Sequence, residues 1–195
     1  DSVPQNGETT VPADFADDMK YSTLTYVASQ TANAMGPSIT DPRTGEILEA
    51  DIMWWHNVSE VFIEWLRVQT TPYCLDTRQL DMPDSLVAQA ARFVACHEMG
   101  HSLGLRHNYM ASAAIPTDSL LSTSYVKRVG NYAPSIMDYA RYNYVAQEGS
   151  DMPVISPHIG EYDMFAIEWG YRWWPDEAAE KQGLKQLMNA HTANI

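Results

Sequence analysis

Residues 97–107 read HEMGHSLGLRH, and the spacing of the first two histidines predicts a metal site on a helix. His97 and His101 are four residues apart, so on a helix their side chains share one face and can bind one ion through imidazole nitrogens. Glu98 is turned by about 100° from His97 around the helix axis. This rotation places its carboxylate beside the ion, where it can accept a proton from bound water.

The end of this helix supplies a third candidate ligand. Gly104 permits a left-handed turn of the backbone, so the chain can return and bring His107 to the same ion. Three neutral imidazoles and a water form the open tetrahedral site that is typical of catalytic zinc. The alternative is that the histidines are ordinary helix residues, but a buried pair without a metal would leave polar nitrogens in need of partners. We therefore expect one zinc ion bound by His97, His101 and His107.

The composition describes an acidic globular domain. The chain has 195 residues, of which 45% are hydrophobic and 19% are charged, which suits a single domain with a substantial core. Twelve basic and 25 acidic residues give a formal net charge of -13, which would repel nucleic-acid backbones and anionic membranes. No apolar run approaches the ~20 residues that a helix needs to cross a bilayer. We expect no nucleic-acid partner and no transmembrane segment.

Local patterns predict a mixed arrangement of helices and strands around the helix that carries His97 and His101. The most regular helix covers residues 86–103, and its apolar stripe ends at His97 and His101. Strands are predicted at residues 21–28 and 46–55, and the turn-forming residues between them favour a hairpin. The other predicted segments are helices at residues 57–70, 118–128, 162–169 and 176–189, an extended lead-in at residues 1–20 and an irregular region at residues 131–157.

A second motif lies downstream, where residues 135–139 read SIMDY. Together with the histidine motif, this Ser-x-Met-x-Tyr pattern resembles the metzincin zinc peptidases. The resemblance implies that Met137 lies in a tight turn beneath the metal and that Tyr139 reaches the zinc or the oxyanion of the transition state. A phenol has a reference pKa of ~10, so Tyr139 could donate a hydrogen bond to developing negative charge at neutral pH. Taken alone, Met137 would be core filler and Tyr139 a surface aromatic residue.

The resemblance extends to large bacterial zinc-dependent metalloproteases, in which further domains flank a metzincin core. The stretches that carry it are residues 39–52, 97–112, 135–147 and 160–171. It implies a metzincin-like α/β fold with a small twisted mixed sheet, a long zinc-binding helix and a C-terminal subdomain of helices and loops. An upper subdomain, residues 21–104, would face a lower one, residues 105–195. Residues 46–54 would form the edge strand against which an extended substrate pairs, and residues 162–171 would close the lower subdomain.

The chain departs from the better-known branches at two points. Asn108 follows the third ligand, where those branches carry Asp, Glu, Pro or Ser, so their specificity cannot be transferred. A metzincin core normally begins with a strand, a long backing helix and further strands, for which only residues 1–28 are present. We therefore expect residues 1–195 to be a single catalytic domain that is a fragment of a larger protein. The resemblance also implies export, to the periplasm, the cell surface or the medium.

Other polar residues are weaker candidates. Cys96 is expected to be a small buried apolar residue, while Cys74 could pair with it or bind the zinc as a thiolate. Aspartates of the lead-in could bind calcium, although a solvated run of charges is the simpler interpretation. These aspartates are Asp14, Asp17 and Asp18. The remaining histidines are expected to be solvated or packed; they are His56, His158 and His191.

Together these patterns predict a zinc-dependent endopeptidase. Zinc would lower the pKa of its water to ~7 and polarise the scissile carbonyl. Glu98 would act first as general base and then as general acid, Tyr139 would stabilise the oxyanion, and Gly104 and Met137 would support the site. The alternative is a non-catalytic zinc-containing module that binds peptides or glycans. Such a loss of activity usually replaces the glutamate, and Glu98 is intact, which favours an enzyme with a protein or peptide substrate.

Overall fold

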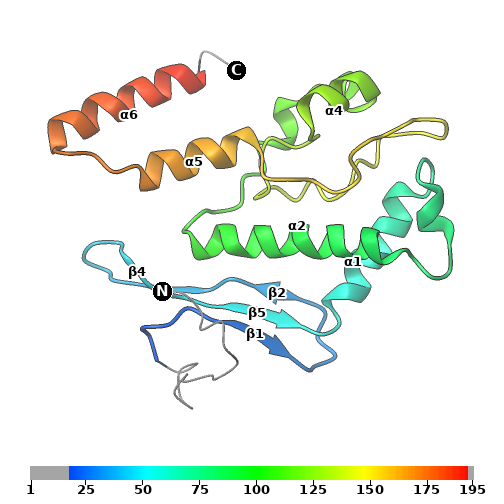
Figure 1. Cartoon of the computed structure of the whole chain (residues 1–195), viewed down its shortest axis with the longest axis horizontal. Helices are drawn as coiled ribbons and strands as arrows, with labels where there is room; N and C mark the ends of the chain where they lie inside the picture. The colour runs from blue at the N-terminus through cyan, green and yellow to red at the C-terminus, as the bar shows by residue number, and fades with distance from the viewer. Residues whose placement is uncertain (1–17, 193–195) are drawn as a thin grey trace, which may run out of the picture.

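The computed structural model describes residues 18–192 and places helix α2, Asp84–Ser102, through the middle of the molecule. The strands lie on one side of α2, and the C-terminal helices lie on the other (Figure 1). Ala90 and Phe93 are buried on the face that leads to His97, because apolar residues recur along this face at helical spacing. The architecture is mixed α/β, and the predicted metal helix is confirmed.

Two small sheets precede the helices. In the larger sheet, β5 (Ile52–Trp55) is the central strand, parallel to β1 (Leu24–Val27) and antiparallel to β2 (Ala34–Met35). In the smaller sheet, β3 (Ser38–Thr40) pairs antiparallel with β4 (Ile47–Ala50). The larger sheet lies against α2 through β2 and β5, so the short strand β2 is the edge that runs beside the metal helix.

Two predictions about these strands need correction. The strands predicted at residues 21–28 and 46–55 do not form a hairpin, because β1 and β5 run parallel and β2, from the intervening segment, supplies the antiparallel partner. The second of them is also divided at Asp51, whose carboxylate accepts a hydrogen bond from the backbone N–H of Thr23 at 2.8 Å. The edge strand expected at residues 46–54 is found only in part: among the described residues β4 pairs with β3 alone and keeps a free edge, whereas β5 is central in the larger sheet, whose edge beside α2 is β2.

Helix α1, Val58–Thr70, follows the sheet directly and confirms the helix predicted in this region. Its residues Phe62 and Leu66 are fully buried and pack with Ala90 of α2 and with Tyr142 from the later loop. The cluster also contains Ala34 of β2, so it joins four segments of the chain. It therefore holds the sheet, α1 and α2 together on the side of the molecule that leads to the histidines.

The second half of the chain consists of loops and further helices, and residues 131–157 are irregular as predicted. The helix predicted at residues 118–128 is divided, because the Ser122 hydroxyl accepts the backbone N–H of Tyr125 at 3.3 Å and starts a new helix. The two helices predicted at the C-terminus are confirmed and are somewhat longer. The elements after α1 and α2 are η2 (Leu75–Arg78), η3 (Ser112–Ala114), α3 (Thr117–Leu120), α4 (Thr123–Val129), α5 (Glu161–Tyr171) and α6 (Glu177–Thr192).

Most of the predicted lead-in, residues 1–20, lies outside the described residues, and so do the calcium candidates Asp14 and Asp17. Asp18 is described, and its carboxylate lies 4.0 Å from the ammonium group of Lys20. Within residues 18–192 no helix combines the length and the apolar character that crossing a bilayer requires.

Candidate metal centre

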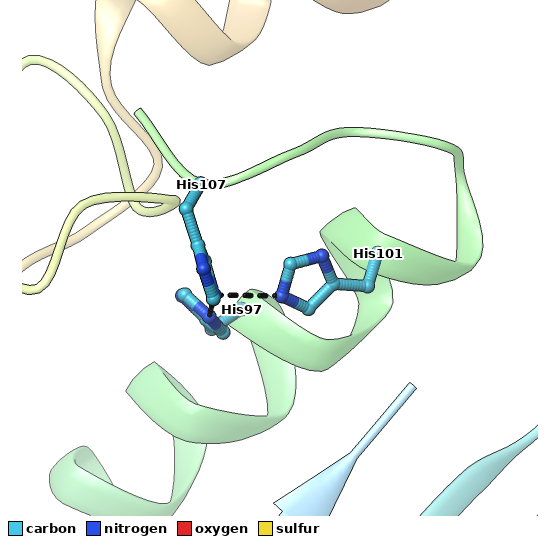
Figure 2. Close-up of side chains that lie close together, drawn as sticks. All are labelled: His97, His101 and His107. Carbon is cyan, nitrogen blue, oxygen red and sulfur yellow. Dashed lines mark hydrogen bonds between the residues drawn. The ribbon is translucent and has the colours of Figure 1, made fainter. Parts of the chain in front are cut away.

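The three histidines of the predicted site come together at the C-terminal end of α2 (Figure 2). His97 and His101 project from successive turns of the helix, which ends at Ser102. Gly104 then takes a left-handed conformation, with φ of +84°, and the chain turns back so that His107 faces the helix. A side chain at position 104 would be strained in this conformation, so glycine suits the turn that returns the third imidazole.

The distances between the ring nitrogens suit a tetrahedral ion. The Nε2 atom of His107 lies 3.2 Å from Nε2 of His97 and 3.1 Å from Nε2 of His101. One nitrogen from each of the three rings lies within 4.8 Å of the others. Zinc–nitrogen bonds of ~2.0–2.1 Å at tetrahedral angles place two nitrogen ligands about 3.3 Å apart. The three imidazoles therefore already have close to the spacing that one zinc ion requires.

Hydrogen bonds on the far side of two rings determine which nitrogens face the centre as acceptors. Nδ1 of His97 donates to the carbonyl of Ile136 at 2.8 Å, and Nδ1 of His101 donates to the carbonyl of Leu105 at 2.9 Å. Because a carbonyl oxygen can only accept, these Nδ1 atoms carry the protons, and the Nε2 atoms of the neutral rings present lone pairs. The Nε2 lone pairs of His97 and His101 therefore point to one place, and the single Nε2 atom of His107 cannot donate a proton to both. A bound cation would satisfy these lone pairs.

Electrostatics also favour the neutral, metal-binding form of His97 and His107. The pKa of His97 is lowered to about 4, chiefly by burial and also by the charges of the other two histidines, while the hydrogen bond to Ile136 and the charge of Asp163 oppose this shift. The pKa of His107 is lowered by its partial burial and by the charge of His101. On its outer side, Nδ1 of His107 lies 3.1 Å from the hydroxyl of Tyr109. Neutral imidazoles at pH 7 are the form that binds a metal.

Met137 lies directly under this part of α2. Its side chain is 1% exposed, and it packs against Gly100, where an added Cβ would overlap the Met137 sulfur. The turn that carries it is bonded to the loop of the third histidine, since the backbone N–H of Asn108 donates to the Met137 carbonyl at 2.9 Å. The sequence analysis did not single out Gly100. Its position on α2 between the two helical histidines leaves room for the Met137 side chain to pack closely against the helix.

A buried acid that the sequence analysis did not single out anchors the same turn. Asp163 of α5 is 3% exposed, and its carboxylate accepts the Ser135 hydroxyl at 2.6 Å and the backbone N–H groups of Ile136 and Gly160 at 2.7 Å each. Asp163 is the third residue of α5, the position from which an acidic side chain can bond back to the start of the helix. The available sequence signal was weak, because glycine rather than serine or threonine precedes the helix.

Glu98 and Tyr139 lie beside the histidines. Both line a cavity of about 290 Å³ together with His97. Burial raises the pKa of Glu98, against the lowering effects of the His101 charge and of a hydrogen bond from the Gly36 backbone. The Tyr139 ring centroid lies 5.6 Å from that of His97, and burial raises the pKa of its phenol, which therefore stays protonated at neutral pH.

None of the weaker candidates that the structure describes joins the three histidines in a metal-binding group. Among residues 18–192, the three histidines above are the one group of three or more His, Cys, Asp or Glu side chains close enough to share an ion. Cys74 and Cys96 are free thiols, and Cys96 packs beside the buried cluster that contains Met137. His191 stacks on Phe165, with ring centroids 4.0 Å apart. His56 hydrogen-bonds to Tyr26, and His158 is exposed.

Comparison with known proteins adds one finding. A family model described as Met-zincin matches residues 79–194, which include α2, all three histidines, the Met137 turn and α5. No curated protein and no solved structure matches the chain.

Proposed function

Since the chain belongs to the Met-zincin family, we propose that it is a zinc-dependent endopeptidase whose metal is held by Nε2 of His97, His101 and His107. The observation that carries this proposal is the convergence of the three Nε2 atoms beside the buried carboxylate of Glu98. Nε2 of His107 lies 3.2 Å from Nε2 of His97 and 3.1 Å from Nε2 of His101. When bound, zinc supplies a Lewis acid that polarises a carbonyl and acidifies a water molecule.

The residues of this chain would handle the protons. Glu98 would take a proton from the attacking water and deliver it to the departing amine, and the burial that raises its pKa makes its carboxylate a stronger base for the first transfer. Tyr139, protonated and beside His97, would donate a hydrogen bond to the oxyanion. Met137 and Gly104 would hold the histidines in place without touching the substrate. The substrate would be a protein or peptide.

The wider assignments of the chain are part of the same proposal. Residues 21–104 would form an upper subdomain and residues 105–195 a lower one, within one catalytic domain. We also propose that the protein is exported, as the resemblance to large bacterial metalloproteases implies. Fractionation of cells that produce it tests this point, since a protein retained with the cytosolic fraction would contradict export.

Metal content and cleavage, measured on matched variants, test the central claim. We expect about one zinc per wild-type chain, loss of the metal in His107→Ala, and retention of it in Glu98→Gln and in the control His158→Ala, where an exposed histidine is removed. Wild type and His158→Ala should cleave a mixed peptide library, while Glu98→Gln should not. A wild type that binds zinc and peptides without cleaving them would instead identify a non-catalytic binding module.

A further inference from the structure

The cavity beside the histidines has mostly apolar walls and one cation. It is lined on one side by His97, Glu98 and Tyr139 and on the other by residues of α1 such as Trp65. Arg141, from the loop that follows the Met137 turn, completes the lining. A volume of about 290 Å³ is enough for one large side chain of a substrate. The cation at its wall therefore bears on which side chains can enter.

Arg141 is held in place by aromatic rings, and among the described residues it has no anionic partner. Its guanidinium carbon lies 3.5 Å from the centroid of the Trp65 ring and 5.6 Å from that of Tyr139. Within residues 18–192, its guanidinium makes no ion pair and donates no hydrogen bond. By contrast, Arg43 and Arg172 each pair with a carboxylate. A half-buried guanidinium with free donors in a cavity is unusual, because such groups normally find acceptors.

The backbone at this position is also special. Arg141 has φ of +52°, and among the described residues it is the only residue other than glycine with a positive φ. This left-handed conformation is uncommon for a side chain as large as arginine and costs free energy, so the surrounding fold must hold it there. Stacking on Trp65 then fixes the plane of the guanidinium, which leaves its edge donors pointing in set directions.

We propose that Arg141 binds a carboxylate of the peptide substrate inside this cavity, an inference that rests on the proposed peptidase function. A planar guanidinium can donate two parallel hydrogen bonds to a carboxylate, and a fixed plane lowers the entropy cost of doing so. Tyr139 lies 5.6 Å from both Arg141 and the His97 ring, and one extended residue spans ~3.5 Å. The carboxylate would therefore belong to a residue at or next to the cleaved bond.

The cavity would distinguish acidic from neutral substrates. Glu98 shares the cavity and would repel an acidic side chain, and apolar walls make an unpaired charge costly, so a carboxylate is acceptable there only when Arg141 pairs with it. Two sources offer the same chemistry: the side chain of Asp or Glu, and the free C-terminus of a short peptide. Both would bind through the same two donors of Arg141.

Paired peptides test the inference. Each pair differs only by Glu or Gln at one position within two residues of the cleaved bond, and a second set compares free with amidated C-termini. We expect kcat/KM to favour the carboxylate by about tenfold at one position, as one charge-assisted hydrogen-bond pair allows. The ratio should fall to about one in Arg141→Asn, because asparagine tolerates the left-handed backbone but carries no charge. Arg141→Lys should keep part of the ratio.

Arg128→Asn is the matched control, since Arg128 also lies over an aromatic ring, that of Tyr125, but does not line the cavity. It should keep the wild-type ratio. A ratio near one in the wild type, or an unchanged ratio in Arg141→Asn, would overturn the inference and leave Arg141 as a packing partner of Trp65. A preference seen only for free C-termini would identify the terminal carboxylate as the ligand.

Binding separates this inference from the proposed function. Calorimetric titration of zinc-containing Glu98→Gln with the same peptides should show the same preference for the carboxylate, and Glu98→Gln/Arg141→Asn should lose it. Preferential binding without cleavage by the wild type would support the role of Arg141 and contradict the peptidase. Cleavage by the wild type without a preference for the carboxylate would support the peptidase and contradict the role of Arg141.

Discussion

Replacing Asp163 should destabilise the protein more than any single change on its surface. The carboxylate is 3% exposed and satisfies three donors: the Ser135 hydroxyl and the backbone N–H groups of Ile136 and Gly160, at 2.6 to 2.7 Å. The same turn carries the carbonyl that holds His97 and the methionine under α2. Loss of Asp163 should therefore affect both the free energy of unfolding and the affinity for zinc.

The size of the effect follows from these bonds. Asp163→Ala leaves the three donors without their acceptor, and each buried donor left unpaired costs about 1–3 kcal/mol, so we expect a loss of about 3–9 kcal/mol. Asp163→Asn keeps an amide oxygen for the two backbone groups but removes the charge. Its hydrogen bonds become ordinary neutral ones, which should cost about 2–3 kcal/mol in total. The first value is a large part of the stability of a typical domain, about 5–15 kcal/mol.

Urea denaturation of the zinc-free protein measures these values directly. Asp176 provides the control, because its carboxylate accepts the N–H of Ala179 at 2.8 Å at an exposed helix start. Asp176→Ala should cost about 1 kcal/mol and Asp176→Asn almost nothing. Zinc titration of the folded Asp163→Asn should show weaker binding by about 10–100-fold, as loss of support behind a ligand usually does. The reasoning is refuted if Asp163→Ala costs no more than Asp176→Ala.

Two further changes probe the surroundings of the catalytic groups. Gly36→Ala should lower the free energy of unfolding by about 1–3 kcal/mol, because the added Cβ would lie 2.5 Å from the backbone oxygen of Glu98. The control Gly170→Ala, in open space on α5, should be neutral or stabilising. If the denaturation curves of the two variants coincide, the reasoning is contradicted. Tyr139→Phe should lower kcat by about 10²-fold or more through loss of one oxyanion donor and keep its zinc, and an unchanged kcat would remove Tyr139 from the proposed mechanism.

The parts of the fold that depend on short-range spacing were predictable. His97 and His101 could be placed on one helix face because the helical period fixes which side chains are neighbours. Gly104 predicted the turn that returns His107, since glycine alone adopts positive φ without strain, and φ of +84° confirms it. The positions of Met137 and Tyr139 relative to the histidines, in contrast, rested on the resemblance to metzincins, because no local rule connects segments 30 residues apart.

The choice of strand partners was not predictable in the same way. Strands β1 and β5 each have strand-like composition, and the turn formers between them suggested a hairpin. The segment between them instead supplies β2, two residues long, which is too short to show a period of its own. Pairing in a sheet depends on which segments reach each other in space, so a two-residue strand can determine the edge of the sheet without a signal in the sequence.

Residues that position the site were missed because their contacts are distant in the sequence. Asp163 and Arg141 looked like ordinary polar residues of a helix and of an irregular loop. Yet the backbone of Ile136 joins Asp163 to the histidines, because its N–H donates to the Asp163 carboxylate and its carbonyl accepts a hydrogen bond from Nδ1 of His97. Arg141 lines the cavity beside His97. The ligand positions are thus encoded locally, whereas the tautomer and orientation of His97 depend on α5. Because bound zinc would stabilise only the folded arrangement, zinc affinity and the docking of α5 should rise and fall together.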